Sequence, residues 1–172
     1  MLKYRKLLLA AAAIATVTAA AAVTGITAAS AAPVTGQAAS GTEYVQIMSA
    51  SATGPSGPAS AIARGVFTAA GQARLGDARD GTIAFPGGTI VLSHRPGKTS
   101  AHFYPAGCLS VISQSGSYRI VRGTGRYAGI SGHGTYQLSL EMVAARARGA
   151  CSSAKPPVAQ QELLRLSGPA RL

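Results

Sequence analysis

Short alternations of apolar and polar residues, separated by glycine or proline about every ten residues, run through this chain from residue 44 onward. The clearest is Thr135–Val143, in which every second residue from Tyr136 to Met142 is apolar. A period of two is typical of a half-buried β-strand, whereas a helix repeats every 3.6 residues. Many short strands at regular spacing predict an all-β sandwich or barrel.

Eight or nine strands are expected. They fall at 44–49, 61–70, 82–85, 89–94, 100–104, 108–114, 118–121, 135–143 and 162–167, and the segments 86–88, 95–98 and 115–116 are expected to be breaks between them. Few strand edges carry the charges that keep an open sheet from pairing with another chain, and closure removes such edges. We therefore predict one antiparallel β-barrel of about eight strands over residues 42–172.

The N-terminus has the pattern of an export signal. Three cations in the first six residues precede an uncharged, mostly apolar stretch over 7–22, and Ala29 and Ala31 supply the small side chains of an A-x-A cleavage site. We expect cleavage after Ala31, which leaves a flexible leader over 32–41 and a secreted protein.

A retained membrane anchor is the alternative for this segment. Its apolar core is rich in alanine and threonine and is marginal in length, because a spanning helix needs about 20 apolar residues. After cleavage no membrane span is expected.

The chain has two cysteines, Cys108 and Cys151. Two cysteines in an exported chain most simply form one disulfide, here worth about 4 kcal/mol in the chain-entropy model. A zinc site would need about four closely spaced ligands, and no C-x-x-C or histidine cluster accompanies these residues. A nucleophilic thiol would need a base, and a free thiol outside the cell oxidises readily.

The glycine-rich segment 122–134 invites a nucleotide-binding interpretation, which its spacing contradicts. The third glycine of a dinucleotide fingerprint falls one position late, a strand follows instead of a helix, and the Gly-Lys-Ser/Thr of a P-loop is absent. We expect a wide connection between two barrel strands, with Tyr127 and Ile130 packed on the barrel end.

The run from Tyr118 to Tyr136 also carries a resemblance. Its pattern, G-x-G-x-Y-x-G-x-x-G-x-G, resembles the glycine motif of the allene oxide cyclase and dirigent-like β-barrel superfamily and of related secreted actinobacterial proteins. The resemblance covers about 43–168, and this motif is its specific part. It implies an eight-stranded barrel around a cavity for hydrophobic or phenolic ligands. The acids that act inside those barrels are not assignable to residues here, so no activity is carried over.

Four residues are the candidates for catalysis: Glu43, Glu141, His94 and His102. A hairpin around the predicted break at 95–98 would bring the two histidines nearly opposite one another, with Cβ atoms about 5 Å apart. Paired imidazoles can bind a metal or exchange protons. No third ligand is evident, so no metal and no cofactor is predicted, and two surface histidines are the simpler interpretation.

The two glutamates pose a different question. Glu141 lies on the polar face of its strand, so it is solvated if the apolar face lines the lumen. If the polar face lines the lumen, it is a buried general acid or base with a raised pKa. Glu43 has the same two interpretations, and no G-x-S-x-G context supports a serine hydrolase.

The formal net charge is +11, most cations are arginines, and most of these arginines lie in the C-terminal half. Basic proteins outside a cell meet anionic wall polymers, for which we expect nonspecific affinity. Sequence-specific nucleic-acid binding is not expected, because aromatic residues are few and tryptophan is absent.

The prediction for function is therefore a secreted barrel that binds a small hydrophobic or aromatic molecule in its lumen. One alternative is a cyclase-like, isomerase-like or dirigent-like enzyme acting on such a molecule. Another is a basic protein of the cell surface or matrix. Catalytic activity and oligomeric state stay open at this point. An open lumen would favour binding, a buried carboxylate catalysis, and a filled barrel with clustered arginines a surface role.

Overall fold

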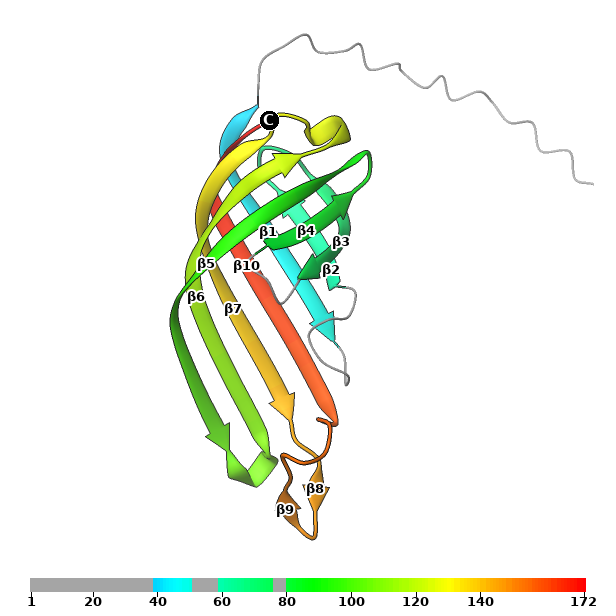
Figure 1. The fold of residues 1–172 in the computed structure, drawn as a ribbon, viewed down its shortest axis with the longest axis vertical. Helices are drawn as coiled ribbons and strands as arrows, with labels where there is room; N and C mark the ends of the chain where they lie inside the picture. The colour runs from blue at the N-terminus through cyan, green and yellow to red at the C-terminus, as the bar shows by residue number, and fades with distance from the viewer. Residues whose placement is uncertain (1–38, 51–58, 76–79) are drawn as a thin grey trace, which may run out of the picture. The chain divides into compact units, whose positions relative to one another are not determined.

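The computed structural model describes residues 39–50, 59–75 and 80–172, and the predicted signal peptide, 1–31, lies outside them. The strands are β1 (Ser40–Ala50), β2 (Ala59–Arg64), β3 (Ala69–Leu75), β4 (Asp80–Phe85), β5 (Gly88–Tyr104), β6 (Leu109–Gly123), β7 (Ser131–Val143), β8 (Arg146–Ala147), β9 (Ala150–Cys151) and β10 (Ala159–Arg171). Eight of them close an antiparallel barrel in the order β1-β10-β7-β6-β5-β4-β3-β2 (Figure 1). This confirms the predicted all-β barrel.

The described residues contain helix only as two short 3₁₀ turns, η1 (Pro105–Gly107) and η2 (Gly125–Tyr127). No helix in this part of the chain is long and apolar enough to cross a bilayer.

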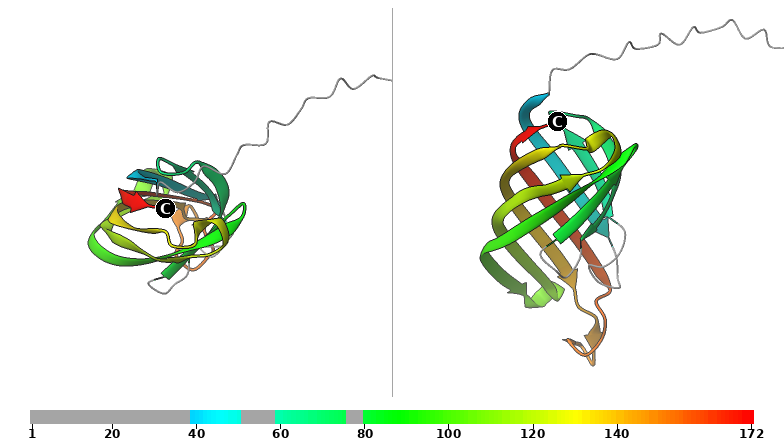
Figure 2. Two further views of the ribbon diagram at one scale, coloured as in Figure 1. Left: turned by 90° about the horizontal axis from the view of Figure 1, so that it is seen from above. Right: turned by 45° about the horizontal axis from the view of Figure 1, so that its top comes forward.

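The strands of the barrel differ greatly in length. Strands β2, β3 and β4 have six or seven residues, whereas β5, β6, β7 and β10 have between 13 and 17. Strand β4 pairs with β5 only as far as Ser93, and beyond that point β5 pairs with β6 alone. The long strands therefore run past the ring as a curved sheet (Figure 2). We call the complete ring the closed half and this extension the open half.

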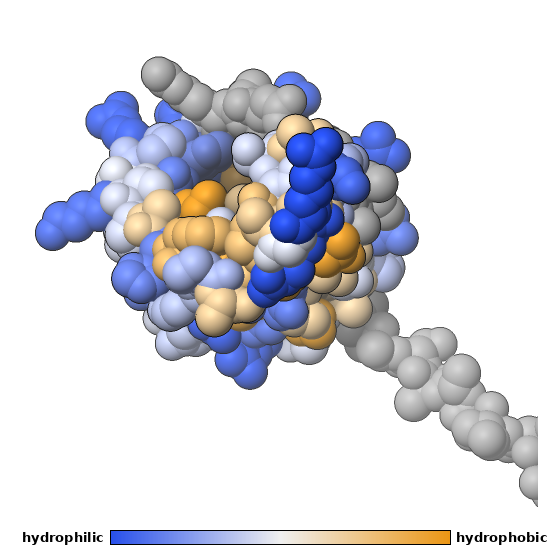
Figure 3. Space-filling model, turned by 90° about the horizontal axis from the view of Figure 1, so that it is seen from below, coloured by the Kyte–Doolittle hydropathy of each residue, from blue (hydrophilic) through white to orange (hydrophobic). Residues whose placement is uncertain are grey.

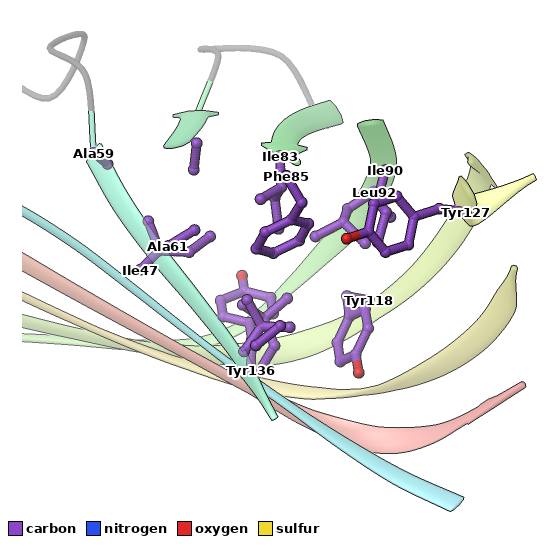
Figure 4. Close-up of a cluster of buried hydrophobic side chains, with 14 of the residues drawn as sticks. Ile47, Ala59, Ala61, Ile83, Phe85, Ile90, Leu92, Tyr118, Tyr127 and Tyr136 are labelled. Atoms are coloured by element: carbon purple, nitrogen blue, oxygen red, sulfur yellow. The ribbon is translucent and has the colours of Figure 1, made fainter. Parts of the chain in front are cut away.

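Packed side chains occupy the lumen of the closed half, and Figure 4 shows their rings and branched chains pointing toward one another. Aromatic rings lie over glycines of neighbouring strands. A Cβ on Gly116 would come within 2.6 Å of the Tyr136 ring, and one on Gly71 within 2.8 Å of the Phe85 ring. These glycines leave the room that the rings need, since a barrel this narrow is filled by its own side chains.

The glycine-rich connection closes the end of this half. Tyr127 is 1% exposed, and its ring lies 5.0 Å from Phe67 and 5.8 Å from Phe85, centroid to centroid. Ile130 is buried as well. The expectation that these two residues pack on the barrel end is confirmed.

The predicted single strand over 61–70 was wrong, because the chain turns back inside it. Strand β2 ends at Arg64 and β3 begins at Ala69. Gly65 at the turn has φ +137°, a left-handed conformation that favours glycine, and a Cβ there would lie 2.1 Å from the carbonyl oxygen of Thr42. A single glycine inside an apolar run is a weak turn signal, which explains the error.

Two predicted breaks were also wrong, because strands run through them. Strand β5 passes Pro96 and Gly97 with a register shift between Pro96 and Thr99. At this position β5 has lost β4 as a neighbour, and an edge strand tolerates proline. Strand β6 continues through Ser115 and Gly116, and the ring of Tyr136 occupies the space that a side chain at position 116 would need.

The predicted disulfide is present. Cys108 and Cys151 are joined with a Cα–Cα distance of 5.4 Å. Cys108 directly follows η1, which joins β5 to β6 at the far end of the open half, and Cys151 lies in β9. The bond thus ties the β8–β9 hairpin to the tip of the long sheet.

Candidate functional site

On the inner face of the open half, the short strands β2, β3 and β4 no longer cover the side chains that point toward the lumen. Residues paired across the strands share a face, so two rows follow from the register. One row is Ala101, Ile112, Leu140, Glu162 and Ser49; the next is Phe103, Ser110, Met142 and Gln160. Their apolar members are half-buried or exposed, and Phe103 is 49% exposed. This face combines five apolar residues with four polar ones and is incompletely covered.

Figure 3 shows the molecule from the end at which the open half lies. Hydrophobic residues gather at its centre, and hydrophilic residues surround them. An apolar patch with a polar rim is typical of a binding site.

A hydrogen-bonded string crosses the inner face at the border between the two halves. The hydroxyl of Tyr136 donates to Oε1 of Gln114 at 2.8 Å, and Nε2 of Gln114 donates to Oγ1 of Thr99 at 3.1 Å. Burial raises the pKa of Tyr136, so its hydroxyl keeps its proton. This chain of hydrogen bonds places polar atoms next to the two rows, and the hydroxyl of Tyr136 is its first donor.

Glu162 is the buried acid of the open half. Its side chain is 7% exposed, its cross-strand neighbours on the inner face are Ser49 and Leu140, and its Oε2 has no hydrogen-bond partner among the described residues. Burial raises the pKa of this carboxyl group. A buried carboxyl oxygen without a partner costs stability, so this position is poised to accept or donate a hydrogen bond.

Glu43 is the corresponding acid of the closed half, and it has a structural role. It is 2% exposed, and its Oε2 accepts a hydrogen bond of 3.2 Å from the backbone N–H of Phe67, which holds the β2–β3 turn. Burial raises its pKa, an effect partly offset by the backbone N–H groups of the turn, at Phe67, Val66 and Arg64. Burial, and to a smaller extent the negative charge of Glu43, raises the pKa of Tyr118.

The other predicted candidates do not meet at one site. His94 and His102 lie on the same strand, β5, so the predicted hairpin that would pair them does not exist. His94 is half-buried with its ring edge-on to Tyr136 at 5.7 Å, whereas His102 is exposed and packs on Tyr104. Glu141 is exposed on β7, facing outward, which agrees with the solvated alternative.

The chemistry of the inner face follows from these groups. Within the described residues no three His, Cys, Asp or Glu side chains are placed to share a metal ion. The face has apolar side chains, the hydroxyl and amide groups of Tyr136, Gln114 and Thr99, and the carboxyl group of Glu162, whose Oε2 has no partner among the described residues. Such a face can orient an apolar molecule through a single polar group, and its carboxyl can exchange a proton with that molecule.

Sequence reasoning did not select Glu162, Tyr136, Gln114 or Thr99 as site residues. A signal for Glu162 was present, because it has the same parity in its strand as Leu164 and Leu166, while Arg165 marks the other face. Glu43 shares parity with Val45 and Ile47 in the same way. For Gln114 and Thr99 no such signal exists, because their partnership depends on the register of β5 on β6.

Comparison of this chain with protein-family models, with curated proteins and with solved structures found no match. The functional argument therefore depends on the site geometry.

Proposed function

We propose that this protein binds a small apolar or aromatic molecule carrying a hydrogen-bond donor, on the inner face of the open half. The observation that carries the proposal is the position of Glu162 on the uncovered face, beside Leu140, with an Oε2 that has no partner among the described residues. Leaving a buried acceptor unsatisfied costs about 1–3 kcal/mol. A ligand hydroxyl or amine offsets that cost, while the apolar body of the ligand covers Ile112, Leu140 and Met142.

The ligand is placed in the open half because packed side chains take up the lumen of the closed half. We propose in addition that the protein is secreted after removal of residues 1–31. A disulfide supports an oxidising compartment outside the cytosol. We also propose kinship with the allene oxide cyclase and dirigent-like barrels, on the resemblance of the glycine motif over 123–134.

The test compares two probes of nearly the same shape. N-phenyl-1-naphthylamine is apolar, fluorescent and has one N–H donor, whereas 1-benzylnaphthalene has a CH₂ group in place of the N–H and no donor. We expect the amine to bind more tightly, by about tenfold for one hydrogen bond to a buried carboxyl group. Equal affinity for the two probes would exclude the role given to Glu162.

Matched variants place the probe on the protein. Glu162→Leu removes the acceptor from the inner face, and Glu141→Leu makes the same change on the outer face of the neighbouring strand. We expect the first variant to lose the preference for the amine and the second to keep it. Native mass spectrometry of the protein from its own secretion medium then identifies the natural ligand by its added mass.

A second candidate function, a cyclase-like or isomerase-like activity, is favoured by the raised pKa of Glu162. A carboxyl group that holds its proton beside a bound molecule can act as a general acid. Incubation with the ligand identified above distinguishes the two functions. An enzyme changes the absorbance or mass of that ligand, and Glu162→Gln keeps binding but stops the change. A binding protein returns the ligand unaltered.

A further inference from the structure

The outer face of the barrel carries grooves that the proposed function does not use. One groove of about 610 Å³ crosses β5, β6, β7 and β10, and its lining includes Lys98, Ser115, Gln137 and Arg165. A second, of about 400 Å³, shares Gln137 and Arg165 with the first and continues over β1 and β2 to Tyr44 and Arg64. The shared residues make the two one continuous outer groove.

The chemistry of this outer groove is cationic and rich in hydroxyl groups. Its charged residues are Lys98, Arg165 and Arg64, and no Asp or Glu of the described ranges lines either part. The outward acid of β7, Glu141, lines neither of them. Between the cations lie small polar side chains, namely Ser100, Ser113, Ser115, Ser139, Thr135 and Ser167.

A third groove, of about 860 Å³, lies further along β5 and β6 and has the same character. It is lined by Ser93, Arg95, Ser117 and Arg119 together with His94, and again without an acid. All three grooves thus complement negative charge, which attracts anions and raises their local concentration.

The spacing of the cations and the aromatic content of the groove both bear on the polyanion that it can bind. Neighbouring strands lie about 4.8 Å apart, so the backbones at Lys98 and Arg165, three strands apart, are separated by roughly 14 Å. Arg64 lies two strands from Arg165 and two residues further along, roughly 12 Å away. Linear polyanions carry their charges more closely than this, so the uncharged residues of the lining decide among them. Stacking of bases needs several exposed aromatic side chains. Among the described residues two aromatic side chains line the groove, Tyr44 and Tyr136, and Tyr136 is buried.

We propose that the outer groove binds an acidic polysaccharide. Its separate carboxylates pair with Lys98, Arg165 and Arg64, and its hydroxyl groups exchange hydrogen bonds with the serine and glutamine side chains between them. Tyr44, which is 47% exposed, offers a flat surface to the apolar face of a sugar ring. The lining of the groove also includes Thr99, Gln114 and Tyr136 of the hydrogen-bonded string, but its cations lie on the outer face, and the proposal does not depend on the ligand of the inner face.

The test uses the mature protein and three probes: a short oligogalacturonate, its methyl ester with the same backbone and no charge, and a thymidine oligonucleotide of equal charge. Titration calorimetry measures each affinity at low and at moderate salt. We expect oligogalacturonate to bind most tightly, with an affinity that falls as salt screens the exposed charges. Absence of oligogalacturonate binding, equal binding of the ester or tighter binding of the oligonucleotide overturns the proposal.

Variants of equal charge locate the site. Lys98→Gln with Arg165→Gln removes two cations from the groove, and Arg122→Gln with Arg171→Gln removes two exposed cations outside its lining. We expect the first pair to weaken binding by about tenfold or more and the second by less than about twofold. Equal losses would mean that net charge alone attracts the polymer and would overturn the assigned groove.

These four positions are exposed, so both double variants are expected to unfold at the temperature of the original protein. N-phenyl-1-naphthylamine should not compete with the oligosaccharide, because the two sites lie on opposite faces of the sheet. Competition between them would contradict the separation of the sites.

Discussion

The closed and the open half of the barrel are built from the same long strands, yet they differ in what covers their inner faces. Along β5 the buried residues, Ile90 and Leu92, all precede His94, and from Arg95 to Tyr104 every residue is exposed. The change coincides with the loss of β4 as a neighbour after Ser93. A strand that keeps its alternation but loses its cover leaves its inner face open, and this is the face on which we propose that a ligand binds.

The two buried acids illustrate the same difference. Glu43, in the closed half, has its carboxylate engaged by the backbone of the β2–β3 turn. Glu162, in the open half, has an oxygen with no partner among the described residues. Glu43 also has one oxygen, Oε1, without a partner among the described residues. The two acids therefore differ in the backbone hydrogen bond that Oε2 of Glu43 accepts and in their position, Glu43 inside the closed ring and Glu162 on the uncovered part of the sheet.

The largest expected effect tests whether the closed half provides the stability. Tyr127→Ala removes a ring from the packed end and should cost about 3–5 kcal/mol in the free energy of unfolding. Phe103→Ala removes a ring from the open half, where it is half exposed, and should cost less than about 1.5 kcal/mol. Urea denaturation measures both, and equal costs would contradict the division into two halves.

The disulfide is the covalent tie of the open half. Replacing both cysteines, Cys108→Ser with Cys151→Ser, should lower the free energy of unfolding by about 2–4 kcal/mol. Hydrogen exchange should rise first in the β8–β9 hairpin and at η1, while amides of β2 and β3 stay protected. Uniform loss of protection in both halves would show that the bond also supports the ring.

The dependence of stability on pH tests the buried acids. Because burial raises the pKa of Glu162 above its ordinary value of 4.5, the native state keeps a proton that the unfolded chain has released. Stability is therefore fully present below pH 4.5 and falls as the pH rises through the pKa of the folded state. Glu43 contributes in the same direction.

Glu162→Gln should make the protein more stable at neutral pH and flatten this dependence, as measured by thermal unfolding across pH. Glu141→Gln, on the exposed outer face, is the control and should leave the profile unchanged. A Glu162→Gln profile as steep as the original would assign the whole dependence to Glu43.

The smallest expected effect concerns the tip of the open half. Arg146 donates from Nη1 to the carbonyl oxygen of Gly149 and from Nη2 to that of Ala106, which joins the hairpin to η1. Arg146→Ala should cost about 1 kcal/mol or less, because these bonds are exposed. Faster hydrogen exchange in residues 146–151 measures it, and a change in the closed half is not expected.

Sequence reasoning succeeded where a local pattern of residues matched the structure. Apolar alternation identified Tyr136, Leu138 and Leu140 as one face of a strand, and the glycine-rich segment was correctly placed on the barrel end with Tyr127 buried. Local signals failed at two positions. The chain turns at Gly65, inside an apolar run that was predicted to be one strand. Strand β5 continues through Pro96, because β4 no longer pairs with it there and an edge strand tolerates proline.

The sequence by itself determined the fold class, the pairing of Cys108 with Cys151 and the parity of each strand, because alternation and punctuation are local properties of the chain. Only the tertiary structure decided which lumen positions are covered. That depends on where the short strands β2, β3 and β4 stop relative to the long ones, and on the register that brings Thr99, Gln114 and Tyr136 together. Contacts between residues far apart in the chain decide both, so no local pattern predicts them.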